Sequence, residues 1–349
     1  MQTCSSIRAC CKSYRLSLLD KSPIAENETA ENALNRTLQL AQLAERGGFH
    51  RFWIAEHHNS AQLASPSPEL LIAWIAGQTQ RIRVGSGGVM LQHYSPYKVA
   101  ENFNVLAALA PGRIDIGIGK APGGLPLSTR ALQRGLNPQE KGDFADQLTE
   151  LDSWLKPGEV TADAESLAAT PLPDVRAEGF LLGASLESAR LAAKLDWNFV
   201  FAAHLNGDKA LLRDVVTEWR RVTQRDLIVA VQVIIAATQS EAERLAQQVE
   251  IWGVELENGQ RVSVASEAQA QAFARQAGSP AVRIFRREPS LIKGSAESVL
   301  AGLDALAAEY GVDEFILDNP LAEANARIAS LHLLSEAWQQ ATLLQEVAQ

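Results

Sequence analysis

The feature that most constrains the fold is a regular alternation of short apolar runs with longer amphipathic stretches. The short runs have the length and composition of buried strands, and the stretches between them carry apolar residues at helical spacing. Eight strand-like runs are predicted, each followed by a helix, at residues 14–20, 49–57, 82–90, 113–119, 179–185, 197–204, 227–238 and 313–320. This order predicts an α/β protein, and the even spacing favours a (β/α)8 TIM barrel over a doubly wound sheet.

The chain is expected to form one barrel domain over residues 14–349. Its 349 residues suit an α/β barrel with insertions, and no linker or low-complexity tract divides them. Residues 1–13 are predicted to be a disordered extension, and residues 125–178 have the weakest pattern. The segment 253–293 is too long for an ordinary connection. We expect it to be irregular and to act as a mobile insertion or lid.

Composition limits the partners of this protein. A net charge of -9 argues against nucleic acid or an anionic membrane as the main partner, because both are polyanions. No apolar run is long enough to span a bilayer. The three cysteines all lie in the first eleven residues, so disulfides are not expected to hold the fold. These features predict a soluble, cytoplasmic protein.

In a barrel, the functional site lies at the rim formed by the carboxyl ends of the strands and the loops that follow them. The predicted strands place polar residues and glycines at that rim after all but one of the eight strands. These rim residues are Asp20, Glu56, His57, His58, Ser86, Gly87, Gly88, Lys120, Ser185, Ser188, His204, Asp318 and Asn319.

The run Glu56, His57 and His58 raises the question of a metal site. Adjacent residues on an extended strand point to opposite faces, so the two histidines cannot easily share one ion. The chain also lacks the H-x-H and H-E-x-x-H patterns of zinc sites. We therefore predict no metal. Glu56 and one histidine are interpreted as hydrogen-bonded partners at a strand end, with the other histidine facing the cavity.

Two segments together suggest a phosphate site. Lys120 follows a glycine-rich strand, but Pro122 breaks the dinucleotide-binding pattern, and a solvated lysine is the default interpretation. The turn from Gly183 through Ala184, Ser185 and Ser188 opens a helix whose free N–H groups attract anions, although a plain serine cap is the commoner case. Because the two segments lie on neighbouring strands, the pair is a credible phosphate site.

The glycines of "RVGSGGVM" lie in a strand that ends at the same rim. Glycine weakens a strand unless another surface must come close. A flat ring packed against Gly87 and Gly88 would explain these residues, and so would a β-bulge. Trp53, Trp74 and Trp197 offer an apolar pocket lining, although core packing is the more frequent role of buried tryptophan.

Several of these segments resemble the bacterial-luciferase-like family of flavin-dependent monooxygenases. The resemblance covers nearly the whole chain after residue 14 and rests on "LSLLD", "FWIAEHHN", "RIRVGSGGVMLQHYSPYKVAENF", "PGRIDIGIGKAPGG" and "LLGASLESARLAA". It implies a (β/α)8 barrel that receives reduced FMN from a separate flavin reductase. Through a C4a-peroxyflavin formed with O2, such an enzyme oxidises an aldehyde or another small organic substrate. The family commonly forms homodimers.

The resemblance also assigns roles to residues. His57 matches the catalytic histidine, which we expect to act as a general acid and base near neutral pH, with Glu56 and His58 in support. Gly87 and Gly88 match the strand that passes the flavin ring, where the family can carry a non-proline cis peptide. Ser185 and Ser188 match the phosphate-binding hydroxyls, and Lys120 stands where the family often has arginine.

Two departures from luciferase argue against light emission. Ala184 replaces an acid near the phosphate, and no cysteine follows residue 11 to match the reactive cysteine. Two other functions stay open at this point. One is hydride transfer with the deazaflavin F420, because the same superfamily includes such enzymes, and the lysine at position 120 would mark a changed cofactor site. The other is a non-catalytic flavin-binding protein.

Overall fold

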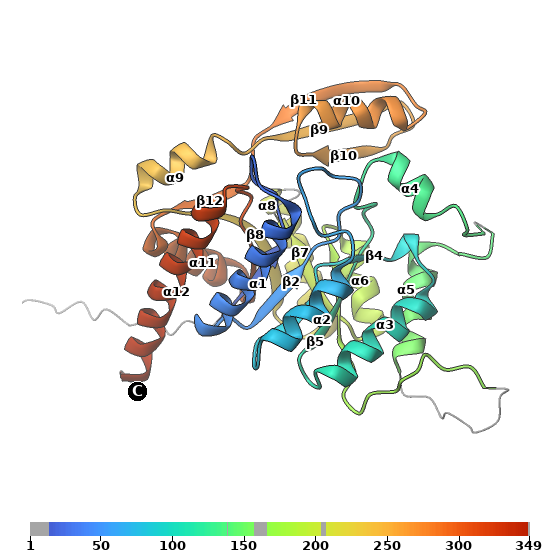
Figure 1. Ribbon diagram of the computed structural model, residues 1–349, viewed down its shortest axis with the longest axis horizontal. Helices are drawn as coiled ribbons and strands as arrows, with labels where there is room; N and C mark the ends of the chain where they lie inside the picture. Colours follow the sequence, from blue (N-terminus) through green and yellow to red (C-terminus); the bar gives the residue numbers. More distant parts are fainter. Residues whose placement is uncertain (1–13, 138, 157–165, 204–206, 348–349) are drawn as a thin grey trace, which may run out of the picture.

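A computed structural model describes residues 14–137, 139–156, 166–203 and 207–347 of the chain. The expected disordered extension 1–13 and the rim residue His204 lie outside these ranges. Eight parallel strands form the centre of the molecule, and helices surround them (Figure 1). The strand order β8-β13-β1-β2-β3-β5-β6-β7 closes on itself because β7 also pairs with β8. The predicted (β/α)8 barrel is confirmed.

All eight predicted strands are present, and they run in the predicted order along the chain. The barrel strands are β1 (Arg15–Asp20), β2 (Arg51–Ile54), β3 (Arg83–Ser86), β5 (Ile114–Gly119), β6 (Glu178–Gly183), β7 (Asn198–Ala202), β8 (Leu227–Ile235) and β13 (Val312–Asp318). Two short strands extend the sheet at the same end of the barrel, namely β4 (Val89–Met90) on β5 and β12 (Leu291–Gly294) on β8.

The surrounding helices begin where the sequence supplies a cap. Thr29 and Ser185 accept hydrogen bonds from first-turn N–H groups, and proline starts two others at Pro68 and Pro96. The helices that cover the barrel are α1 (Ala30–Arg46), α2 (Pro68–Gln78), α3 (Pro96–Leu109), α5 (Phe144–Leu155), α6 (Leu186–Leu195), α8 (Lys209–Thr223), α11 (Ala296–Tyr310) and α12 (Ala324–Val347).

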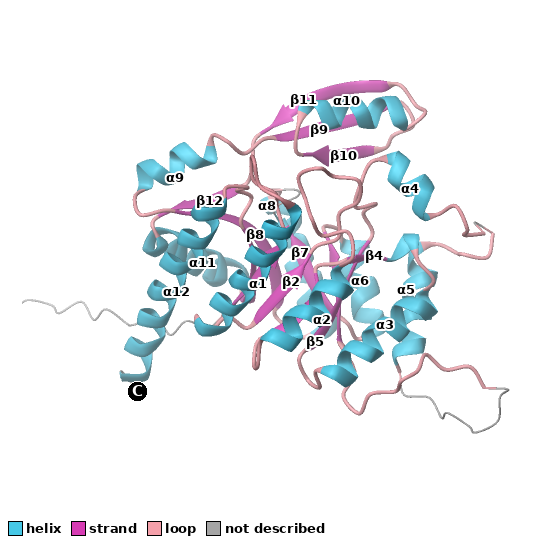
Figure 2. Cartoon of the chain, in the orientation of Figure 1, coloured by secondary structure: helices cyan, strands magenta, loops and turns pink. Residues whose placement is uncertain are grey.

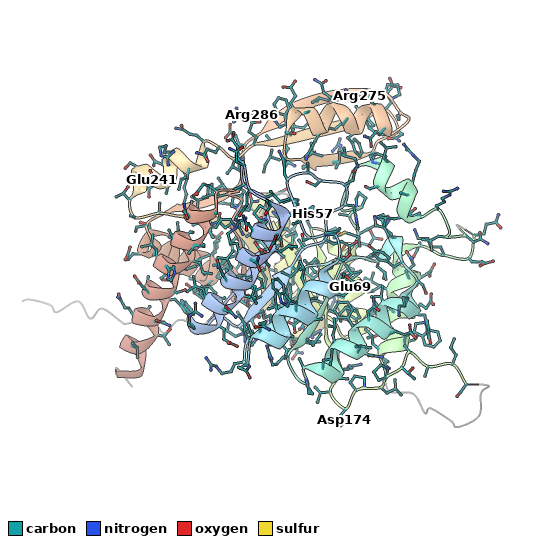
Figure 3. The ribbon with its side chains drawn as sticks, viewed as in Figure 1. His57, Glu69, Asp174, Glu241, Arg275 and Arg286 are labelled. Carbon is teal, nitrogen blue, oxygen red and sulfur yellow. The ribbon has the colours of Figure 1, made fainter. Side chains whose placement is uncertain are left out.

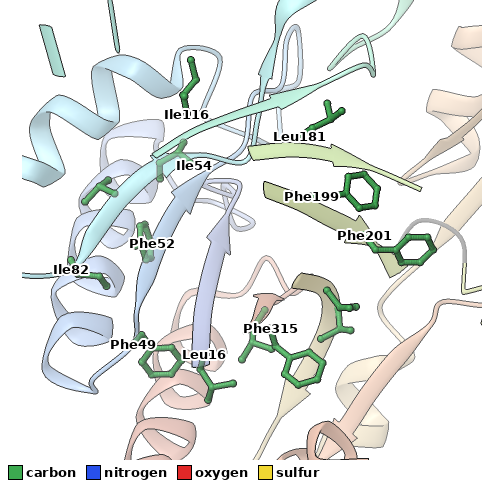
Figure 4. Packing of buried hydrophobic residues seen from close by; sticks show 14 of the residues in the cluster. Leu16, Phe49, Phe52, Ile54, Ile82, Ile116, Leu181, Phe199, Phe201 and Phe315 are labelled. Carbon is green, nitrogen blue, oxygen red and sulfur yellow. The ribbon is translucent and has the colours of Figure 1, made fainter. Parts of the chain in front are cut away.

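Alternate strand residues separate two hydrophobic layers. Outward-facing side chains pack under the helices, as Phe52, Ile116, Phe199 and Phe315 do in Figure 4. Inward-facing side chains fill the barrel itself, which is a packed core and not a pore. This inner cluster consists of Leu19, Trp53, Ala55, Phe180, Val200, Ile228, Ala230 and Ile316.

The amino-end floor of the barrel is ionic. Arg51 is buried, and its guanidinium lies 2.9 Å from Asp115 Oδ1, 2.9 Å from Glu314 Oε1 and 3.2 Å from Glu178 Oε2. These carboxylates raise the pKa of Arg51 above its ordinary value, against the opposing effect of burial. Charge is thus concentrated at the end of the barrel opposite the predicted site. At this amino end, residues serve mainly the stability of the fold.

Contrary to the expectation of an irregular insertion, the segment 253–293 contains a small folded unit. Strands β9 (Ile251–Leu256), β10 (Arg261–Val264) and β11 (Ala281–Arg287) form an antiparallel sheet in the order β10-β9-β11. Helix α10 (Glu267–Gln276) covers one face of this sheet. Its residues Ala270 and Phe273 form a core with Val254 and Leu256 of β9. Figure 2 shows this unit at one end of the barrel, apart from the ring of helices.

Two other sequence predictions are corrected, and one further helix is found. After the seventh strand, the sequence pattern predicts a helix over residues 240–252. The structure has the shorter α9 (Gln239–Ala246) there, because Ile251 and Trp252 already belong to β9. The strand expected at 82–90 is interrupted at Gly87 and Gly88, which divide it into β3 and β4. A short helix, α4 (Pro126–Leu132), lies in the weakly patterned region and packs near α10.

No helix in the described ranges is both long and apolar enough to cross a bilayer.

Candidate functional site at the carboxyl end of the barrel

His57 lies in the loop that follows β2, and a second loop holds it in place. Its backbone N–H donates to the carbonyl of Ser65 at 3.0 Å, and the Ser65 hydroxyl donates to the carbonyl of Lys21 at 2.9 Å. A β-bridge between Pro23 and Leu63 ties the same two loops together farther out. The loops after β1 and β2 therefore form one connected unit at the rim. Figure 3 labels His57 at the barrel end nearest the small sheet.

The imidazole of His57 is neutral at physiological pH. Its Nδ1 is buried and has no hydrogen-bond partner among the described residues, although the side chain as a whole is partly exposed. Burial lowers its pKa from 6.5 to about 4, and the nearby positive charge of Lys21 lowers it further, against a smaller opposing effect of Asp318. Burial thus places the pKa of His57 below the near-neutral value that the sequence suggested.

Lys21 belongs to a buried polar cluster beside His57. Its ammonium lies 2.6 Å from Asp318 Oδ2, and the side-chain amide of Gln232 donates to the same oxygen at 2.9 Å. Asp318 ends β13 and is 1% exposed, whereas the Lys21 side chain remains 25% exposed. Asp318 and Gln232 alternate with outward-facing neighbours, so both point into the barrel at its carboxyl end.

Glu56 and His58 contact each other and a tyrosine instead of His57. His58 Nε2 lies 2.6 Å from Glu56 Oε1, and the Tyr94 hydroxyl donates to the same carboxylate oxygen at 2.8 Å. Glu56 Oε2 accepts the N–H of Met90 in β4 at 3.1 Å. Burial and the Glu56 carboxylate raise the pKa of Tyr94, which keeps its hydroxyl protonated. This trio fixes the loops after β2 and β4, as the predicted structural pair would.

The rim glycines have close protein neighbours. The peptide bond between Gly87 and Gly88 is cis. A Cβ on Gly88 would lie 2.7 Å from the carbonyl oxygen of Gly117, and a Cβ on Gly87 would lie 2.6 Å from Leu19 Cδ1. Ser86 bonds to Gly117 through its side chain, which brings the two strands together. The approach of β3 to β5 and β1 therefore requires glycine here, in addition to the two explanations that the sequence left open.

The predicted phosphate-binding residues gather at the start of α6. Ser185 caps the helix by accepting the N–H of Ser188 at 3.1 Å, and its hydroxyl donates to Ser188 Oγ at 3.0 Å. A Cβ on Gly183 would lie 2.9 Å from Ser188 Oγ, so glycine keeps this turn open. All three residues, with Ala184 between them, are only partly buried. Two hydroxyls and the unpaired N–H groups of a first helical turn suit the terminal phosphate of a flavin.

Lys120 stands at the same level of the rim. The register pairs Gly119 with Leu182, so Lys120 and Gly183 are the next residues of neighbouring strands. Its side chain is exposed, and within the described ranges no ion pair engages its ammonium. The structure thus places Lys120 near the α6 turn without joining the two by a hydrogen bond, which leaves the lysine free to meet a phosphate as a point charge.

Other predicted rim residues have structural partners. Asp20 is 2% exposed, accepts the Thr37 hydroxyl at 2.5 Å and pairs with Arg327. Arg327 also donates to the carbonyl of Asn319. Across the described part of the chain, no three His, Cys, Asp or Glu side chains are grouped to hold a metal ion.

The three tryptophans do not line one pocket. Trp53 lies in the barrel core and donates to Asp115 at 2.9 Å, and Trp197 is buried and donates to Asp152 at 2.9 Å. Trp74 is 37% exposed on α2. The pocket interpretation of these residues is therefore wrong, and core packing accounts for two of them.

Comparison with known proteins agrees with this geometry. The family model described as luciferase-like monooxygenase matches residues 15–314. The chain belongs to the luciferase-like monooxygenase family. The resemblance seen in the sequence is thereby confirmed.

Relatives of this luciferase-like chain cover almost its whole length. It is 42% identical to N-acetyl-S-alkylcysteine monooxygenase of Bacillus subtilis over 93% of this chain and 98% of the relative. The crystal structure of apo-MsnO8 has a TM-score of 0.74 and 30% identity over 93% of this chain and 98% of that one. An FMN complex of the oxygenating constituent of 3,6-diketocamphane monooxygenase from Pseudomonas putida shares the fold, with a TM-score of 0.67 at 19% identity over 94% and 98% of the chains.

Sequence reasoning missed three side chains at the site of this luciferase-like chain. Lys21 directly follows a predicted strand, so the rule that found Asp20 should have included it. Gln232 is the one polar residue in the apolar run 227–238 before its final threonine, which is itself a signal. Tyr94 lies in a loop, and nothing in its local sequence indicates a contact with Glu56.

Proposed function

We propose that this protein is a flavin-dependent monooxygenase that uses reduced FMN and O2 to oxidise a small organic substrate. The reaction balances when one oxygen atom enters the substrate and the other leaves as water, with two electrons from the flavin. Family membership supports the reaction class. The observation that carries the site assignment is His57, whose neutral imidazole has a buried Nδ1 with no hydrogen-bond partner among the described residues, at the same rim as a helix terminus that suits a phosphate.

The residues at the rim suit the two ends of FMN. The α6 turn, with Gly183, Ser185 and Ser188, would hold the phosphate, and Lys120 would balance its charge. The Gly87–Gly88 strand would lie beside the flavin ring. When bound, reduced FMN supplies the electrons that activate O2.

His57 is assigned the proton-handling role. Because its pKa of about 4 keeps it neutral at pH 7, the imidazole can donate a hydrogen bond from one ring nitrogen and accept a proton at the other. The Glu56–His58–Tyr94 trio positions the surrounding loops. It would thereby keep water away from the reacting atoms, which matters because water diverts oxygen chemistry into peroxide release.

The first substrates to test are N-acetyl-S-alkylcysteines. The Bacillus subtilis relative named for them aligns with 93% of this chain. A separate flavin reductase and a homodimeric state also belong to the proposal, because the family resemblance implies both. The small sheet of residues 251–287 is proposed to act as a lid over the rim.

The test begins with an anaerobic titration of the protein with reduced FMN, and with reduced F420 in parallel. Oxygen and N-acetyl-S-methylcysteine are then added, and product is detected as the mass of one added oxygen atom. We expect preferential binding of reduced FMN and substrate-dependent product. The His57→Gln variant should bind reduced FMN within roughly threefold of the native affinity, while product formation falls on the order of 100-fold and peroxide release rises.

Each alternative predicts a different result. Preference for F420 without oxygen consumption would identify a hydride-transfer enzyme. Flavin binding without faster reoxidation for any substrate would identify a non-catalytic flavin-binding protein. Unchanged turnover in His57→Gln would remove this residue from the mechanism.

A further inference from the structure

Lys21 is a cation at the rim that no part of the proposed cofactor site uses. It follows β1, on the opposite side of the barrel from Lys120 and the α6 turn, which follow β5 and β6. The hydrogen bonds through Ser65 hold its backbone beside that of His57. Among the positive charges that lower the pKa of His57, Lys21 has the largest effect.

The ammonium of Lys21 is held by one hydrogen bond and has N–H donors to spare. Asp318 accepts it at 2.6 Å, and Gln232 fixes the same carboxylate oxygen at 2.9 Å from inside the barrel. A lysine ammonium has three N–H donors, so two remain after this bond. Because Asp318 is 1% exposed and the Lys21 side chain 25% exposed, the pair presents its cationic end to the solvent side.

An ammonium held in this way is suited to bind an anionic ligand. A buried carboxylate restricts the position of the ammonium and leaves its other N–H groups for a ligand. The protein has a net charge of -9, so an anionic ligand gains no general attraction and needs a local cation. N-acetyl-S-alkylcysteines carry such an anion, because the N-acetyl group leaves the carboxylate as their only charge.

We propose that Lys21 Nζ binds the carboxylate of the substrate and thereby presents its reacting atom to the region beside His57. This inference rests on the proposed function and narrows it to small organic acids. Lys21 is then a residue that determines specificity, and Asp318 and Gln232 are positioning residues that hold the ammonium in place.

The test compares an acid with its uncharged analogue on the FMN-loaded protein. The probes are N-acetyl-S-methylcysteine and its primary amide, measured by steady-state oxygenation with reduced FMN and by calorimetric binding to the oxidised-FMN form. We expect native kcat/KM to favour the acid on the order of 10- to 100-fold. Lys21→Gln should remove this preference by raising KM for the acid, with the amide unaffected. Lys21→Arg should retain most of it.

A matched control uses Lys98→Gln, which neutralises an exposed lysine on α3 that pairs with Glu101. This variant should keep the native preference for the acid. The comparison of acid and amide on the native protein needs no variant, so it holds even if Lys21→Gln folds poorly.

The outcomes separate the two proposals. Equal use of acid and amide by the native protein, or an undiminished preference in Lys21→Gln, would overturn the role of Lys21. If the acid binds through Lys21 but is not oxygenated, the anchor stands and the proposed reaction fails. If the acid neither binds nor reacts, both proposals fail.

Discussion

At the scale of single residues, neighbours in sequence have separate tasks. Glu56 and His58 share a hydrogen bond and hold loops in place, whereas His57 between them turns to the other side and meets the charges of Lys21 and Asp318. The alternation of side chains along an extended segment makes this division predictable. The partners are not predictable in the same way, because Tyr94 and Gln232 come from distant parts of the chain.

The two histidines with strongly lowered pKa values make the fold acid-sensitive. Burial lowers the pKa of His57 and of His50 from 6.5 to about 4. Because the unfolded chain binds more protons between these values, the protein loses stability as the pH falls from about 6.5 towards 4. Each histidine should contribute about 2 kcal/mol of this loss between pH 7.5 and pH 5.

Urea unfolding at pH 7.5 and pH 5 measures this loss. The free energy of unfolding should fall less for His57→Gln than for the native protein, and less again when His50→Gln is added. Carboxylates titrate equally in all three proteins, so the difference isolates the histidines. Identical pH dependence in all three would show that His57 is not buried as a neutral group.

At the scale of elements, the small sheet of residues 251–287 shows where sequence patterns lose power. Its strands are four to seven residues long and largely exposed on one face, so their apolar residues are too few to give a clear period. The barrel strands were predicted because a core covers both faces and makes them continuously apolar. The small sheet has its own core, in which Val254 packs with Phe273. Contacts of this kind between separate segments cannot be predicted from the local sequence pattern.

If this small sheet is a lid, ligands should protect it from proteolysis. Trypsin can cut after Arg261, which is exposed at the end of a hairpin turn. Reduced FMN with N-acetyl-S-methylcysteine should slow this cut by at least roughly threefold, because closure restricts local opening. Cleavage after Arg176, in an exposed loop elsewhere, serves as the control. Equal protection at both positions, or none at either, would count against a lid.

At the scale of the whole molecule, the two ends of the barrel have different electrostatic designs. The floor is a dense set of ion pairs around Arg51, and the carboxyl-end rim carries separate groups with unused donors or acceptors. Removing one partner of a buried ionic cluster leaves charges uncompensated. The floor should therefore govern stability and the rim should govern function.

Replacing Arg51 tests this division. Arg51→Leu should lower the free energy of unfolding by about 3 kcal/mol or more, because Asp115 and Glu314 lose their buried counter-charge and keep only the less buried Arg83 and Arg15. The control Arg213→Leu breaks an exposed pair with Glu309 and should cost less than about 1 kcal/mol. Thermal unfolding measures both, and the affinity of folded Arg51→Leu for reduced FMN should stay native. A large loss of affinity would contradict the separation of the two ends.

The bridge between Pro23 and Leu63 has a consequence for engineering this barrel. The loop that carries Lys21 and the loop that carries His57 are fastened together by that bridge and by Ser65, so neither can change length or shape independently. A transplant of one loop from a relative would break its anchor points on the other. Specificity in this scaffold should therefore be exchanged as a two-loop cassette, residues 21–29 with residues 55–67, and not one segment at a time.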